Sequence, residues 1–340
     1  GGINDFLVDQ SGGISTTHAL GINYSDNWGK KMEVTASYFL NNSINDAFQY
    51  VDRLFVDDSD VERTYVENSG SDANNLNHRF NARLDYKISN KTSLLIRPSF
   101  SFQNNNGSSN TIGTNLSNLQ TISETINQFS SNLDGLKFDN SILIRHRLNK
   151  PRRTVSVNLR TGYSDNTGVR DLSSINNFFT GGILTQSLLQ SADLVTQGWS
   201  FSSNLSYTEP VGQRGMIMTD YRYSYQDDNS DQETYDFNEL TNTYDLLNLL
   251  YSNTFANNQS SHQLTTGYNY NKDKLNFMLR SGLQFTELIN DVTLPNLVEL
   301  SRNFVNLLPM AMIRYKFTDQ TNIRLFYRTS TQTPQVEQLQ

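Results

Sequence analysis

The chain has 340 residues, no cysteine and a formal net charge of -7, with a pI near 5.1. The missing cysteines exclude disulfide staples and thiolate metal sites, and the acidic balance argues against a nucleic-acid partner, which needs a basic face. A transmembrane helix is excluded because no run of about 18 apolar residues occurs, but a transmembrane β-strand needs only about 9–11 residues with one apolar face.

The first alternating segment is GINYSDNWGKKMEVTASYFLNN, residues 21–42. Ile22 and Tyr24 precede a short polar turn, and Val34, Ala36 and Tyr38 follow it at every second position. A period of two is typical of a β-strand with one apolar face, so the segment predicts a β-hairpin.

The same pattern recurs five times further along the chain, which predicts twelve strands in six hairpins. The expected pairs are residues 20–24 with 32–40, 80–88 with 94–102, 142–144 with 155–163, 199–207 with 217–225, 264–270 with 275–285, and 311–317 with 323–327. Their turns centre near residues 28, 90, 150, 211, 272 and 319, so five of the six recur about every 60 residues.

The connections between the hairpins are long and rich in Asn and Ser, at residues 43–76, 104–135, 166–196, 227–257 and 287–306. Phe48, Tyr50 and Leu54 alternate within the first of them, so we expect strands to continue beyond a membrane boundary there. Short turns at one end and long connections at the other are typical of an outer-membrane barrel, with short periplasmic turns and long extracellular loops. A propeller would show similar connections at every blade, and a soluble all-β domain is the alternative.

Charged side chains fall on the non-apolar positions of the expected strands. An Arg or Lys at the bilayer midplane costs about 2–4 kcal/mol, so these positions must face away from lipid. Tyr221 and Tyr223 should therefore point outward, with Arg83–Asp85 and Asp220–Arg222 as polar ladders inside. Two roles of these inward charged side chains remain open: a structural role, in which they contact a plug or solvent, and a role in moving an anionic substrate. The expected lumen-facing residues are Arg83, Asp85, Arg97, Arg160, Asp220, Arg222, Arg280, Arg314, Arg324 and Arg328.

Aromatic residues cluster near the short turns, where a girdle at the periplasmic interface would lie. They could also reflect the general preference of Tyr and Phe for strands. The residues concerned are Tyr24, Trp28, Tyr86, Tyr207, Tyr270, Tyr315 and Phe317.

No constellation points to an enzyme, a metal or a cofactor. The four histidines, at 18, 78, 146 and 262, are scattered, with no HExxH or GxSxG motif. Asp227, Asn229 and Asp231 alternate as calcium ligands would, but Asn238 stands where an EF-hand loop has its closing Glu. Solvated turns are the expected role of that group and of the acidic residues at 57, 58, 60 and 62.

Several stretches resemble the large outer-membrane β-barrel family related to TonB-dependent receptors. They are GINYSDNWGKKMEVTASYFLNN, LNHRFNARLDYKI, SYTEPVGQRG and NLLPMAMIRYKFTDQTNIRLFYRTSTQTPQVEQLQ. The resemblance implies an all-β, antiparallel transmembrane barrel of about 22 strands with an N-terminal plug inside it. No plug, immunoglobulin-like domain or TonB box is recognisable here, so residues 1–340 are expected to form a single partial barrel domain. Its terminal strands, near Ile14–Tyr24 and Thr321–Arg328, should be left as open edges.

The function that the resemblance implies is binding a ligand and importing it across the cell outer membrane. The expected partners are outer-membrane lipid, a plug domain, the TonB system and a ligand of unknown identity. The alternative is a non-transporting barrel that acts as an adhesin or as a scaffold for an envelope complex.

Overall fold

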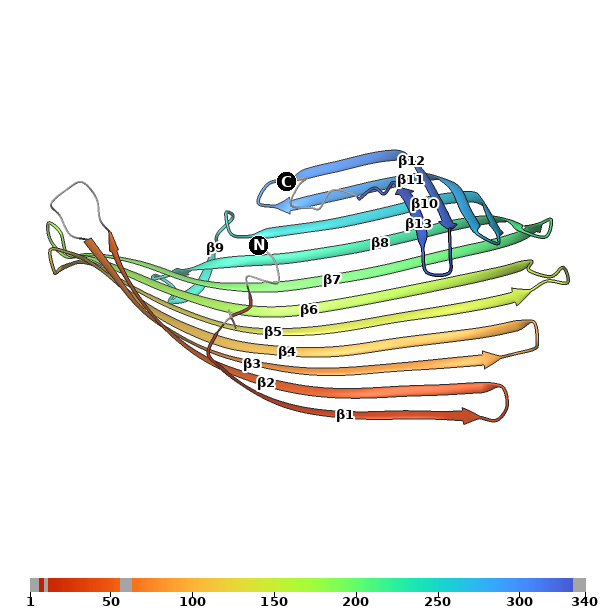
Figure 1. Ribbon diagram of the computed structural model, residues 1–340. Helices are drawn as coiled ribbons and strands as arrows, with labels where there is room; N and C mark the ends of the chain where they lie inside the picture. Colours follow the sequence, from red (N-terminus) through yellow and green to blue (C-terminus); the bar gives the residue numbers. More distant parts are fainter. Residues whose placement is uncertain (1–5, 9–11, 56–62, 333–340) are drawn as a thin grey trace.

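The structure is a computed structural model that describes residues 6–8, 12–55 and 63–332, and it is built from β-strands (Figure 1). None of its described helical segments is long and apolar enough to cross a membrane. The thirteen strands are β1 (Ile14–Trp28), β2 (Met32–Phe55), β3 (Arg63–Lys87), β4 (Thr92–Ser117), β5 (Gln120–Arg147), β6 (Thr154–Phe178), β7 (Leu184–Val211), β8 (Gly215–Asn238), β9 (Thr243–Leu247), β10 (Asn253–Lys272), β11 (Leu275–Leu294), β12 (Val298–Lys316) and β13 (Asn322–Arg328).

Twelve of these strands form one antiparallel sheet in which each strand pairs with the next along the chain. The short β9 lies off this path and pairs with β8 alone, so β8 continues to β10. The six predicted hairpins are therefore confirmed, whereas β9 was not predicted. Within the described residues β1 pairs only with β2 and β13 only with β12, so the predicted open edges are confirmed too.

The prediction of long loops at one end is wrong for most of those residues, which are strand, whereas the expected continuation of a strand through Phe48, Tyr50 and Leu54 is confirmed. The strands from β2 to β8 are 24–28 residues long, more than twice the ~10 residues that a membrane crossing needs. β4 and β5 are joined by Asn118 and Leu119 alone, with φ of 48° and 65°. Two consecutive left-handed residues give the type I′ turn that suits a tight hairpin.

Cross-strand polar pairs explain why Asn- and Ser-rich segments extend as strands. In the β4–β6 region Asn104 donates a hydrogen bond to Asp134 at 2.7 Å, and Thr125 donates to Asn176 at 2.6 Å. Each such pair contributes about 0.2–1 kcal/mol relative to an alanine pair. We call these strand extensions, on the side away from the short turns, the distal arms.

Register separates an apolar face from a polar face. Opposite partners share a face, and Leu84, Ile96, Ile142 and Leu159 follow one another across β3 to β6. The sheet is curved (Figure 1), and Phe6 and Val8 lie against its polar face at Gly168 and Gly107. A sheet with one largely apolar face in the half near the turns must cover that face with lipid or protein.

Candidate functional site: the polar face of the sheet

All ten residues expected to face the lumen lie on the polar face. One row shows this: Arg97 lies opposite Ser141, and Arg160 lies opposite both Ser141 and Ser202. Arg222 lies opposite Asn204 and Gln263 in the same way. The register therefore brings residues from β3 to β13 onto one wall, although whether that wall lines a closed lumen stays a prediction.

Two ion pairs occur among these ten residues. Arg83 and Asp85 are 3.2 Å apart within β3, as expected. Asp220 pairs with Arg280 rather than with the neighbouring Arg222, which corrects the predicted ladder. Asp220 and Arg222 are two residues apart in β8 and therefore share the polar face. Asp220 nevertheless pairs with Arg280 of β11, which lies two strands away across β10.

Gly267 makes the Asp220–Arg280 pair possible. It lies opposite Arg280, and a Cβ atom at Gly267 would lie 2.3 Å from the Cγ of Arg280 and 2.5 Å from the Leu279 carbonyl oxygen. The absent side chain leaves room for the arginine to lie across β10 toward Asp220. The only sequence signal for this role is a glycine within a strand, which marks a close approach of other atoms.

The other six arginines make no ion pair with any described residue. Arg97 and Arg160 line a depression of about 330 Å³, and Arg222 and Arg328 line another of about 540 Å³ with the Asp220–Arg280 pair. Arg314 and Arg324 lie directly opposite each other, a like-charge arrangement that is unfavourable without a counter-ion. This part of the polar face can therefore bind anions or acidic side chains.

The N-terminal segment, residues 6–8, packs against the polar face of the distal arms. Phe6 is 0% exposed and Val8 5% exposed. Phe6 joins Leu133, Ala192 and Leu194 in one apolar cluster, and the guanidinium of Arg170 lies 5.1 Å from its ring centre. A cation over an aromatic ring adds about 0.5–2 kcal/mol to the apolar contacts.

Small side chains form the row beneath this segment. Ala73 lies opposite Gly107, and Gly107 lies opposite Ser131. A Cβ atom at Gly107 would lie 2.5 Å from a methyl group of Val8, so the glycine is needed for the close approach. Neither the burial of Phe6 nor this row was predicted, because contacts across a sheet between distant segments leave no local pattern.

A cavity of about 820 Å³ lies beside the N-terminal segment. Its lining includes Phe129 and Leu172 from the polar face, Ile14 at the start of β1 and Tyr244 of β9. Pockets of about 300–1,000 Å³ with apolar linings and a few polar groups are typical of small-molecule sites. The cavity is a candidate site for a ligand.

The β8–β10 connection carries Tyr244 inward. Thr234 and Ser252 are 0% and 2% exposed. The hydroxyl of Thr234 donates to the carbonyl of Tyr251 at 2.9 Å, and the hydroxyl of Ser252 accepts the backbone N–H of Thr234 at 2.9 Å. These buried hydrogen bonds fix the connection over the polar face of β8, since breaking them would leave buried polar groups unpaired.

The apolar face carries an aromatic row that was not predicted. Its members are direct neighbours across six strands: Tyr38, Phe80, Phe100, Phe138, Tyr163 and Trp199. Aliphatic positions separate this row from the aromatic residues near the short turns, which are Tyr24, Trp28, Tyr86, Tyr207, Tyr270, Tyr315 and Phe317. Two aromatic rows on either side of an aliphatic band are typical of a membrane-spanning barrel. The members of the unpredicted row lie six to twelve residues from the short-turn ends of their strands, so no single spacing in the sequence marks them.

The histidines and acidic groups singled out in the sequence do not come together. Three histidines hydrogen-bond across strands on the apolar face, His78 with Tyr38, His146 with Thr92 and His262 with Tyr221. Asp227 accepts a hydrogen bond from Asn229, and Asp231 accepts one from Thr254. The described residues contain no group of His, Asp and Glu that could hold a metal, and the acidic residues at 57, 58, 60 and 62 lie outside them.

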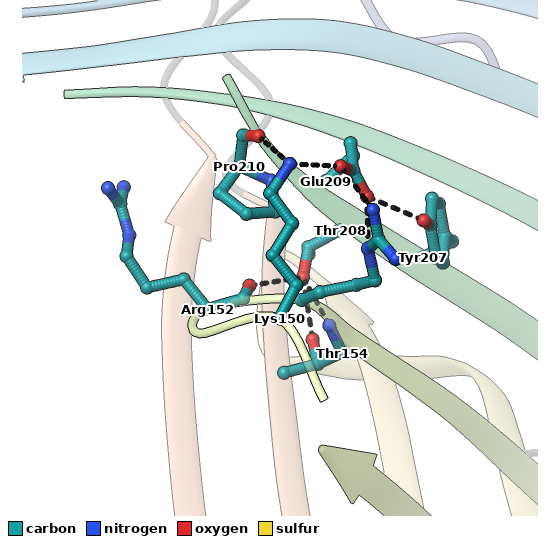
Figure 2. Close-up of polar contacts among 8 residues, drawn as sticks. Lys150, Arg152, Thr154, Tyr207, Thr208, Glu209 and Pro210 are labelled. Carbon is teal, nitrogen blue, oxygen red and sulfur yellow. Dashed lines mark hydrogen bonds and ion pairs between the residues drawn. The ribbon is translucent and has the colours of Figure 1, made fainter. Parts of the chain in front are cut away.

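At the short-turn end, Figure 2 shows a cluster around Glu209. Its carboxylate accepts two hydrogen bonds from Arg153, at 2.6 and 2.7 Å, and one each from Lys150 and Tyr207, both at 2.6 Å. These donors, led by Arg153, lower the pKa of Glu209 well below its ordinary value of 4.5. Glu209 lies two residues beyond Tyr207 and opposite Ile217, at the short-turn edge of the apolar face.

Comparison with known proteins agrees with this geometry. A search of curated proteins found none that matches the chain. The sequence profile of the outer membrane protein beta-barrel family matches residues 146–340, more than half of the chain. The chain therefore belongs to the outer membrane protein β-barrel family, which places it in the cell outer membrane.

Proposed function

We propose that the protein is a TonB-dependent receptor-like barrel that binds a ligand outside the membrane and imports it. The observation that carries the proposal is the cavity of about 820 Å³ beside the buried N-terminal segment. A scaffold needs neither a cavity on the polar face nor chain folded against it. The proposal assigns no catalytic step to the chain.

The proposal includes a closed barrel of about 22 strands, of which the twelve-strand path is one part. The unpaired edges of β1 and β13 support this, because an exposed strand edge is a liability unless another strand covers it. The polar face would then line the lumen, with its ten charged residues turned away from lipid.

A plug domain is the proposed partner of this wall. Acidic side chains of a plug would pair with Arg97, Arg160 and Arg222, which form no ion pair with any described residue. Charge-assisted hydrogen bonds of this kind are stronger than neutral ones. The TonB system would supply the energy that displaces the plug.

Growth of deletion strains tests the proposal. Strains of the source bacterium that lack this gene, the TonB system or both are grown on a panel of nutrients, each as sole source of its element. Import predicts at least one nutrient on which both single deletions fail and the double deletion is no worse, with growth restored by the intact gene.

A variant with the cavity filled makes the test specific to this chain. Ser109→Trp places a large side chain at a cavity-lining position and should lower growth on that nutrient, while Ser109→Ala should not. Normal growth of the gene deletion on every nutrient would reject import and favour the adhesin or scaffold alternative.

A further inference from the structure

The two ends of the sheet differ strongly in charge. The six short connections, between β1 and β2 and so on to β12 and β13, contain eight basic and two acidic residues. The connections at the other end, with the short β9 counted as part of the β8–β10 connection, contain no basic and six acidic residues. The basic residues are Lys30, Lys31, Lys91, Lys150, Arg152, Arg153, Arg214 and Lys274.

Five of these residues form a continuous platform on three neighbouring turns, which we call the basic platform: Lys91, Lys150, Arg152, Arg153 and Arg214. Side-chain hydrogen bonds join the turns, from Lys91 to Asn149 at 2.7 Å and from Arg152 to the carbonyl of Gln213 at 2.8 Å. Lys150 also donates to the carbonyl of Pro210 at 2.8 Å. Glu209 is the acid within this cluster, so positive charge remains in excess (Figure 2).

The platform borders the apolar face directly. Tyr207 lies opposite Val155 on that face, and its hydroxyl donates to Glu209 at 2.6 Å. Lysine and arginine side chains at such a boundary bury their aliphatic stems and keep their charges at headgroup level. Neither nucleic acid nor a soluble anion requires this combination of an apolar wall and adjoining cations.

We propose that the basic platform binds the headgroups of anionic glycerophospholipids in the leaflet at the short-turn end. Phosphate oxygens accept hydrogen bonds from Lys and Arg, and the acyl chains lie along the apolar face beside Tyr207. The binding requires the membrane placement of the chain and no transport activity, so it stands or falls separately from import.

Native mass spectrometry of the full-length protein in neutral detergent tests the proposal, with phosphatidylglycerol and phosphatidylcholine as probes. Each cation near an anionic lipid surface contributes about fivefold to affinity. The variant K91Q/R152Q/R214Q leaves the Glu209 contacts intact and should weaken phosphatidylglycerol binding on the order of 100-fold. It should bind phosphatidylcholine as the wild type does.

Two further variants separate charge at the platform from total charge and from misfolding. R53Q/R63Q/R302Q removes three exposed cations from the distal arms and should bind phosphatidylglycerol normally. K91R/R152K/R214K keeps the platform charge and should also bind it. Equal binding of both lipids by the wild type, or an equal loss in both charge-removing variants, overturns the proposal. A co-purifying acidic protein without lipid preference would overturn it in favour of a protein partner.

Discussion

Tyr221→Arg tests the assignment of the two faces. Tyr221 lies opposite Leu205 and Leu264, and its hydroxyl contacts His262 at 2.8 Å. An Arg near the middle of a lipid-facing band costs about 2–4 kcal/mol, and losing the hydrogen bond adds about 0.5–1.5 kcal/mol. The expected loss is about 3–5 kcal/mol of the free energy of folding into a bilayer.

The neighbouring substitution Arg222→Tyr is the matched control. Arg222 is exposed on the polar face between Asn204 and Gln263, so its replacement should change stability by no more than ~0.5 kcal/mol. Urea titration of the full-length protein in phospholipid vesicles measures both.

A second control separates the lipid from the face itself. Phe48→Arg lies on the same side of the sheet as the apolar positions but in a distal arm, where Phe48 is 74% exposed. If water surrounds this position, Phe48→Arg should lower the free energy of folding by no more than ~1 kcal/mol. Equal destabilisation by Tyr221→Arg and Arg222→Tyr would refute the face assignment, and a large effect of Phe48→Arg would refute the position of the membrane boundary.

Three other predictions follow from single contacts or from topology. A Glu-specific protease added to intact cells should cut near Glu239, whereas trypsin added to intact cells should not cut at Lys150 or Arg153. The reverse result would invert the topology. Phe6→Ala should release the N-terminal segment, seen as faster amide exchange at residues 6–8 and 168–170, while Leu7→Ala, which removes a partly exposed side chain, should not. Because the folded pKa of Glu209 is lowered, its stabilising contacts are complete above pH 4.5 and are lost as pH falls through the lowered pKa. Arg153→Gln should move that loss to higher pH in a carboxyl NMR titration, and an unchanged midpoint would contradict the role of Arg153.

The membrane half of the fold could be predicted because its rule is local. Lipid on one face and water or protein on the other impose a period of two, so Val34, Ala36 and Tyr38 already show which positions share a face. The same rule placed all ten charged residues on one face, as the register shows. Hairpin order followed because antiparallel neighbours need only short turns.

The distal arms could not be predicted in this way. Water on the outer side removes the penalty for a polar residue, so the alternation disappears although the backbone pairing continues. Asn118 and Leu119 form a two-residue turn without the Asn-Gly signal. The Asp220–Arg280 pair depends on Gly267, and which arginine reaches Asp220 is a matter of side-chain space rather than of sequence spacing.

The register also orders the features of the polar face along the strands. The cavity lies at the level of Ala47, and the N-terminal segment lies at the level of Ala73 and Gly107. The part of the polar face that carries the eight arginines expected to face the lumen, which we call the arginine wall, begins at Arg83, opposite Thr35. Ala47 is nine residues beyond Tyr38 of the aromatic row, which is about 30 Å along an extended strand. Under the proposed function, a ligand is therefore captured well outside the bilayer and meets the arginine wall only after passing the segment that contains Phe6. Since Phe6 is held by Leu133, Ala192 and Leu194 of β5 and β7, displacement of this segment, rather than a widening of the hydrogen-bonded sheet, is the movement that import requires.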